Sequence, residues 1–372
     1  MKQNNYLLNL LKVTIFSFLL IATAPVRAEI KVVTTIKPLH SLIANVMDGI
    51  GEPGLIIDGS ISPHSFTMKP SHAKMLEEAD VIFWIGESIE TSMEGPLDSI
   101  AKGAEVIEFM ELDSIAKLKF REESIFGDHD DHDDHDDHDD HDDHDDHDDH
   151  DDHDDHDDHD DHDDHDDHDD HDDHDDHDDH DDHDDHDDHE DHEDHDDHDH
   201  HGHAHGEFDA HIWLDPMNAK EMVHEIAHEL GHLDPANKDK YEANAEATMK
   251  ALDKLISEVG NDINSDAKFV VFHDAYQYFE ERFGVRAAGA LTLNTDVLPG
   301  AKQIADIQDV IKDKGIKCIF SEPQFNPKII STIAEDTNIK TGVFDPLGAN
   351  IDPGKSLYFE LISNLGNELK GC

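Results

Sequence analysis

The chain has 372 residues, with 93 acidic and 27 basic side chains and a formal net charge of −66 at pH 7. One tract between residues 128 and 199 holds 48 of the acidic residues, so the rest carries 45 acidic against 27 basic side chains. Both parts are acidic, which argues against binding to nucleic acid or anionic lipid surfaces. Without that tract and the N-terminal apolar run, the chain is long enough for two modest α/β domains.

The N-terminus has the features of a secretory signal. Lys2 precedes an apolar run over about residues 7–24, and the run ends in Val-Arg-Ala at residues 26–28. The run is too short for a stable membrane span, and small residues favour cleavage after Ala28. We expect residues 1–28 to be removed. The junction has no cysteine to accept a lipid, so we expect a free, soluble protein in a bacterial periplasm.

Beyond the signal, apolar strand-like runs alternate with amphipathic helical stretches, which is typical of an α/β fold with mostly parallel sheets covered on both faces. Ser71 is a candidate N-cap of the second helix. The expected strands are 31–36, 54–57, 81–85, 268–272, 318–320 and one that ends at Phe344, and the expected helices start near Pro38 and Ser71 or span 238–261, 275–283, 301–314 and 327–335.

The helix expected over residues 238–261 is longer than an average helix. Its apolar residues recur at steps of three or four from Tyr241 to Val259, the spacing of one helix face. We interpret it as a rigid connector between an N-terminal lobe, residues 29–237, and a C-terminal lobe, residues 262–372.

The acidic tract interrupts the first lobe as an insertion at residues 128–206. Histidine recurs at every third position between acidic pairs, with almost no apolar side chain, so we expect disorder without metal. Its imidazoles and carboxylates can bind several divalent ions weakly, as a zinc reservoir or a sensor; a solvated spacer is the alternative. Representative candidate ligands are His129, His132, His135, His200, His201, His203 and His205.

Outside the tract only eight histidines remain, and three of them lie at strand ends or in loops: His64, His211 and His273. Ligands bind beyond the carboxyl ends of parallel strands, so these side chains can converge in one cleft. Three imidazole nitrogens and one oxygen donor suit tetrahedral Zn²⁺. Because zinc binds neutral imidazole, the affinity should fall as the pH drops through the histidine range near roughly 6.5.

Seven segments, three of which contain these histidines, are spread over nearly the whole mature chain and are similar to the zinc-specific periplasmic binding proteins of the ZnuA type, which serve ABC transporters. The resemblance implies two (β/α)-type lobes joined by one long helix, with Zn(II) as the transported ligand in the cleft and an inner-membrane permease as partner. We expect the protein to be a monomer without catalytic residues. The matching segments are IKPLHSLIANVM, SPHSFTMKPS, ADVIFWIGESIE, HIWLDP, VFHDAYQYFEERFG, SEPQF and FDPLG, in the family's order.

Carried over residue by residue, the resemblance places His64, His211 and His273 on the metal. Manganese-specific relatives have an acidic residue at the position of His273 and an aspartate at that of Asp345, which makes Asp345 a candidate fourth ligand. Some zinc members have a glutamate where this chain has Pro63.

The two cysteines, Cys318 and Cys372, can form a disulfide in an oxidising compartment or remain two unpaired thiols. They match the paired cysteines of the ZnuA-type proteins, which favours the disulfide.

Residues 224–234, HEIAHELGHLD, also fit a zinc-protease pattern in which His224 and His228 bind the metal and Glu225 acts as base. The same spacing, continued to His232, places three histidines along one solvent face of a helix. A secreted metallopeptidase, an exposed accessory zinc face and an ordinary surface therefore all remain open for this segment.

Overall fold

The computed structural model describes residues 30–125, 206–293 and 299–372. The expected signal and the His-rich tract with its candidate ligands lie outside these ranges. All described residues belong to one compact unit, and none of their helices is long and apolar enough to cross a membrane.

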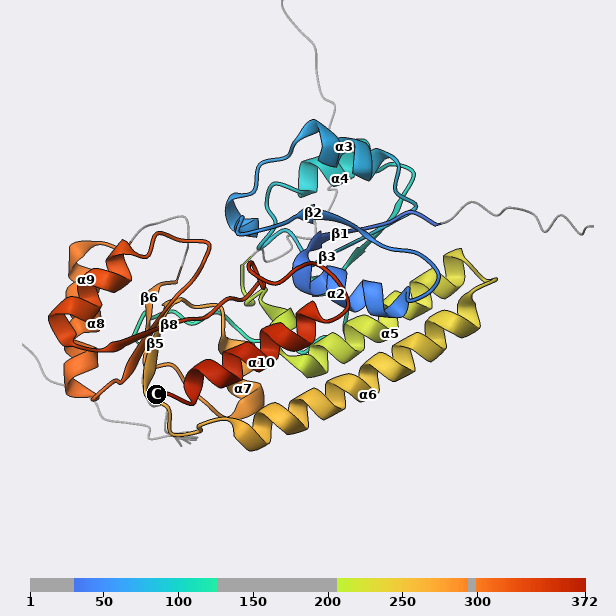
Figure 1. Cartoon of the computed structure of the whole chain (residues 1–372). Helices are drawn as coiled ribbons and strands as arrows, with labels where there is room; N and C mark the ends of the chain where they lie inside the picture. The colour runs from blue at the N-terminus through green and yellow to red at the C-terminus, as the bar shows by residue number, and fades with distance from the viewer. Residues whose placement is uncertain (1–29, 126–205, 294–298) are drawn as a thin grey trace, which may run out of the picture. The chain divides into compact units, whose positions relative to one another are not determined.

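The first sheet has four parallel strands in the order β2-β1-β3-β4 (Figure 1). Its central strands, VVTTI and VIFW, are buried along their whole length, which is why they are almost continuously apolar. The elements are β1 (Val32–Ile36), α2 (Lys37–Val46), β2 (Gly54–Ile57), η1 (Pro63–Ser65), α3 (Pro70–Glu77), β3 (Val81–Trp84), α4 (Glu94–Ile100), β4 (Glu105–Glu108) and η2 (Phe109–Glu111).

The second sheet also has four parallel strands, in the order β6-β5-β7-β8. One of its two central strands, FVVFH, is fully buried and ends at a histidine. The elements are β5 (Phe269–His273), α7 (Gln277–Phe283), β6 (Ala290–Thr292), α8 (Ala301–Asp313), β7 (Cys318–Ser321), α9 (Lys328–Thr337) and β8 (Lys340–Val343). The α/β class with parallel sheets is confirmed.

Of three long helices, α6 packs against both α5 and α10, and all three pack against α2 (Figure 1). The longest, α6, has the expected apolar stripe, in which Tyr241, Leu252 and Val259 are buried. One continuous core contains residues of both sheets and of these helices. The remaining elements are η3 (Ile212–Leu214), α5 (Pro216–Leu233), α6 (Lys238–Asp262) and α10 (Leu357–Leu369).

The disulfide joins Cys318 of β7 to Cys372, with 5.6 Å between the Cα atoms. It fastens the end of α10 to the second sheet.

The expectation that Ser71 caps its helix was wrong. Helix α3 begins one residue earlier, at Pro70, and Lys69 occupies the N-cap position. Proline suits the first turn because its ring sets a helical φ and its missing N–H would have no partner there. The Lys69 amide donates instead to Nδ1 of His72, at 3.3 Å. His72 is thus a capping residue, and His40 contacts the Pro53 carbonyl.

Candidate metal centre

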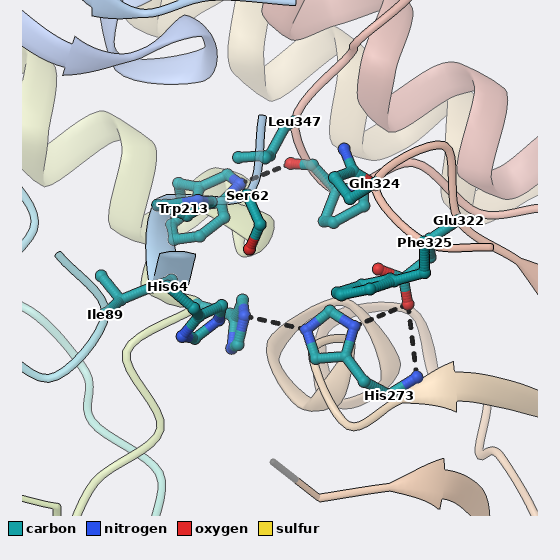
Figure 2. A pocket seen from close by; sticks show the side chains of 12 residues that line it. Ser62, His64, Ile89, Trp213, His273, Glu322, Gln324, Phe325 and Leu347 are labelled. Atoms are coloured by element: carbon teal, nitrogen blue, oxygen red, sulfur yellow. Dashed lines mark hydrogen bonds and ion pairs between the residues drawn. The ribbon is translucent and has the colours of Figure 1, made fainter. Parts of the chain in front are cut away.

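His64, His211 and His273 come from three separate segments and meet at one point. His64 lies in η1 after β2, His211 directly precedes η3, and His273 is the last residue of β5. Each offers a ring nitrogen, and these nitrogens lie within 4.8 Å of one another. The ring centroids are 5.6 Å apart for His64 and His211, 6.1 Å for His64 and His273, and 5.2 Å for His211 and His273. Figure 2 shows His64 and His273 facing the same pocket.

Two buried carboxylates orient two of these rings. Nδ1 of His211 contacts Asp209 Oδ1 at 2.7 Å, and Nδ1 of His273 contacts Glu322 Oε1 at 2.7 Å. A neutral ring that donates from Nδ1 leaves the lone pair of Nε2 free for an ion. The two Nε2 atoms lie 3.3 Å apart, and Nε2 of His64 is buried without a hydrogen-bond partner among the described residues. The three free nitrogens therefore point into one small space.

The carboxylates are held by the same backbone that carries the histidines. The His211 amide donates to Asp209 Oδ1 at 3.0 Å, and the His273 amide donates to Glu322 Oε1 at 3.3 Å. Asp209 is 1% exposed and Glu322 is 3% exposed, so water does not compete for either contact. Glu322 follows β7, the strand beside β5. Neither residue is a candidate from sequence alone, although the Asp-x-His spacing at 209–211 is a local signal for the first.

Burial shapes the protonation of the cluster. It lowers the pKa of His64 to about 2, with further lowering by the other two histidines. The pKa of His211 is also well below its usual value, because of burial and then His273. For His273 burial opposes the charged form, but the carboxylates of Glu322, Asp274 and Asp209 together outweigh burial and raise the pKa. Burial raises the pKa of Asp209 to about 7.

A buried network of ion pairs involves Asp274, the residue that follows His273. Arg121 donates to Asp274 Oδ1 at 2.8 Å and to Glu280 Oε2 at 2.5 Å. Arg121 belongs to the segment that precedes the His-rich tract, and Asp274 directly follows His273. In the same segment the Leu118 amide donates to the Tyr278 hydroxyl, which donates to the carbonyl of Asp209. The segment that contains Leu118 and Arg121 is therefore packed on the elements that carry two of the histidines.

The walls of the pocket are mostly apolar. Its lining, beside the three histidines and Glu322, consists of Ser62, Pro63, Ile89, Trp213, Gln324, Phe325, Pro346 and Leu347. The Trp213 ring centroid lies 5.3 Å from that of His211, and its Nε1 donates to the Pro346 carbonyl at 2.8 Å. Apolar walls close to the imidazole nitrogens suit a single ion that has lost most of its water.

Asp345 does not join the cluster. Its Oδ1 accepts from Gln324 Nε2 and from the Leu347 amide, both at 3.1 Å, and its Oδ2 accepts from the Ala349 amide at 2.6 Å. The carboxylate thus closes the loop that follows β8. Within the described ranges, no fourth His, Cys, Asp or Glu ligand atom lies within the same distance of all three imidazoles. Pro63, the first residue of η1, offers no side-chain donor.

The zinc-protease pattern lies on α5, which contains none of the three clustered histidines His64, His211 and His273. His224, His228 and His232 are all exposed. The described metal-ligand clusters on this helix are Glu225 with His228 and Glu229, and Glu229 with Glu105 and His232. His224 belongs to neither cluster, so the first metal ligand of the peptidase pattern stands apart from both.

A protein family described as "ZnuA: Zinc-uptake complex component A periplasmic" matches residues 32–372. The chain belongs to this family. A protein named high-affinity zinc uptake system protein ZnuA, from Brucella abortus (strain 2308), is 46% identical over 92% of this chain and 91% of its own length. Proteins of the same name from Haemophilus influenzae and Yersinia pestis are 35% and 29% identical, over 98% and 96% of this chain and 98% and 95% of their own lengths.

Solved structures share the fold of this ZnuA family member. A crystal structure of ZnuA has a TM-score of 0.61 at 19% identity and covers 91% of this chain and 98% of that one. A zinc-bound ZnuA lacking residues 138–173 of its own numbering has a TM-score of 0.60 at 20% identity and covers 92% and 98%. The ZnuA family consists of solute-binding proteins, and nothing in these comparisons supports the metallopeptidase alternative.

Proposed function

We propose that this chain captures Zn²⁺ outside the cytoplasm and delivers it to the permease of an ABC transporter for uptake. The observation that carries the proposal is the convergence of three imidazole nitrogens from three segments, within 4.8 Å of one another. Imidazole is a preferred zinc ligand, and carboxylate-oriented rings bind the ion more strongly than free ones. In this proposal His64, His211 and His273 are the ligands, and a water molecule completes the tetrahedron because Asp345 is engaged elsewhere.

Release is expected to require separation of the ligands. We propose that His64 and His211 belong to a lobe formed by residues 29–237, that His273 belongs to a lobe formed by residues 262–372, and that α6 connects the two. Lys37, at the start of α2, donates to the carbonyls of Gly348, Ala349 and Ile351 at 2.6–3.1 Å. These contacts, with the one from Trp213 to Pro346, are among the bonds that a permease would have to break to release the ion.

Capture can be measured through Trp213, which lines the pocket. The chain has two tryptophans, so Trp84→Phe leaves one fluorophore beside the site. Free zinc is fixed with a chelator buffer, which makes the result independent of zinc held by the tract. We expect a saturable change of Trp213 emission, lost when His64, His211 and His273 are all changed to alanine and retained in His224→Ala. A triple variant that responds at the same free zinc concentration would refute the proposed ligand set.

We propose further that residues 1–28 export the protein to the periplasm, where it acts as a monomer, and that the His-rich tract is a low-affinity zinc reservoir or sensor. Imidazole at every third position supports metal binding over simple solvation. Replacing the tract histidines with asparagine at unchanged length should remove most of the zinc that the protein binds beyond the first equivalent in equilibrium dialysis. It should leave the midpoint of the Trp213 response unchanged. Equal zinc uptake by both proteins would mean that the tract is only a spacer.

A further inference from the structure

A second group of metal-ligating side chains lies on the surface where the last two turns of α5 meet β4. The group consists of Glu229 of α5, Glu105, the first residue of β4, and His232 near the end of α5. Each offers one ligand atom, and the three atoms lie within 4.8 Å of one another. Glu229 also forms a second such triad with Glu225 and His228. None of these residues contributes to the pocket described above.

The charges in this group are unbalanced. Burial and the adjacent Glu229 carboxylate raise the pKa of Glu105, because two carboxylates in contact resist ionisation together. His228 and His232 act in the opposite direction. Within the described part of the chain, no lysine or arginine forms an ion pair with Glu105 or Glu229. A bound cation would relieve this repulsion.

The ring of His228 is already oriented by its neighbour. Its Nδ1 contacts Glu229 Oε1 at 2.8 Å, and the His228 side chain is 66% exposed while that of Glu229 is 11% exposed. Glu229 is therefore a nearly buried carboxylate flanked by an exposed imidazole on the helix and by an acidic residue on the sheet. That combination differs from a purely acidic surface, which would offer no nitrogen donor.

We propose that Glu105, Glu229 and His232 bind a divalent cation of the Zn²⁺, Ni²⁺ or Mn²⁺ class at the junction of α5 and β4. One imidazole and two carboxylates supply three ligands, and water fills the remaining positions because Glu105 and His232 reach solvent. The ion cross-links the C-terminal end of α5 to the edge strand of the first sheet. The site binds more weakly than the buried pocket because it holds more water and fewer nitrogens.

Chemical footprinting of the full chain tests this proposal in solution. Carbodiimide coupling measures the reactivity of Glu105, and diethyl pyrocarbonate measures that of His232, each resolved by peptide mass spectrometry with Zn²⁺ alone as the probe. At a free zinc concentration about ten times the dissociation constant of the site, we expect both rates to fall about tenfold. The rate of Glu221, on the same helix but in neither triad, should not change.

Two variants separate ligands from neighbours. His232→Gln is an exposed change that should fold normally and abolish the zinc protection of Glu105, whereas His224→Gln should preserve it. Unchanged rates at millimolar zinc, protection that survives His232→Gln, or protection of His228 without His232 would each overturn the assignment. The Trp213 response, followed in the same samples, reports on the pocket independently, so failure of one site is distinguishable from failure of the other.

Discussion

Replacing Glu322 with glutamine isolates the part that a buried carboxylate plays in zinc capture. Glu322 accepts from both Nδ1 and the amide of His273, and it lies beyond the ring, on the side away from the shared space. Figure 2 shows this arrangement. Glutamine keeps the shape and one oxygen acceptor but removes the negative charge. The variant therefore tests orientation together with charge, while the three imidazoles stay in place.

The size of the effect follows from the role of the carboxylate. A partner of this kind contributes about 10–100-fold in metal affinity, or about 1.4–2.7 kcal/mol. We expect the zinc affinity of Glu322→Gln to fall within that range. Because Glu322 raises the pKa of His273, the variant should also release fewer protons when zinc binds at pH 6. The two effects are linked, since the same charge holds the proton and strengthens the ligand.

The assay combines Trp213 emission in zinc buffers, in the Trp84→Phe background, with calorimetry in two buffers of different ionisation enthalpy. Glu335→Gln is the matched control because Glu335 is exposed on α9. It should change neither quantity. An unchanged affinity together with unchanged proton release in Glu322→Gln would refute the inference that this carboxylate tunes the site.

Three further outcomes are expected. Zinc affinity should fall by up to two decades per pH unit below about pH 7. A fall of three decades is not expected, because Asp209 and His273 hold the displaced protons, whereas His64 and His211 have a low pKa and stay neutral. A slope of three in a pH series of zinc titrations would contradict this. Changing Cys318 and Cys372 to alanine should lower the free energy of unfolding by about 4 kcal/mol in denaturant titrations, since the bond closes a loop of 54 residues; an unchanged midpoint would argue against a stabilising cross-link. Asp345→Asn should cost roughly 1–3 kcal/mol of stability through its loop contacts yet leave the Trp213 response to zinc in place, and loss of that response would restore Asp345 as a ligand.

The pH series also refines the simplest expectation from sequence. Three ordinary histidines would each titrate near roughly 6.5 and release up to three protons. Burial lowers the pKa of His64 so far that this ring has no proton to release, and Asp209 and His273 hold the protons that zinc displaces. The direction is the same, lower affinity at lower pH, but the steepness differs.

The convergence of the three histidines could be predicted from the sequence, because each follows a recognisable strand or loop signal and parallel sheets gather such positions at one edge. The contact between Glu322 and His273 could not be predicted, because 49 residues separate them and only the pairing of β5 with β7 brings them together. Asp345 shows the converse: its position resembles that of a ligand, yet nearby backbone amides occupy its oxygens.

The fold shows a similar division. Long apolar strands and the 25-residue helix α6 were predictable because their periodicity is strong. Strand β4, with the sequence EVIE, was not predicted because it is a short edge strand that is only partly buried. Helix α3 was misplaced by one residue because a serine looked like a cap while the preceding proline takes the first turn.

The central claim, that three imidazoles share one ion, is tested most directly by locating zinc in crystals of the protein loaded with one equivalent. Anomalous scattering at the zinc edge should give one strong peak at about 2.0–2.1 Å from Nε2 of His64, His211 and His273. A fourth oxygen ligand should belong to water. A peak bound by fewer than three of these nitrogens, or a strongest peak elsewhere in the chain, would contradict the account.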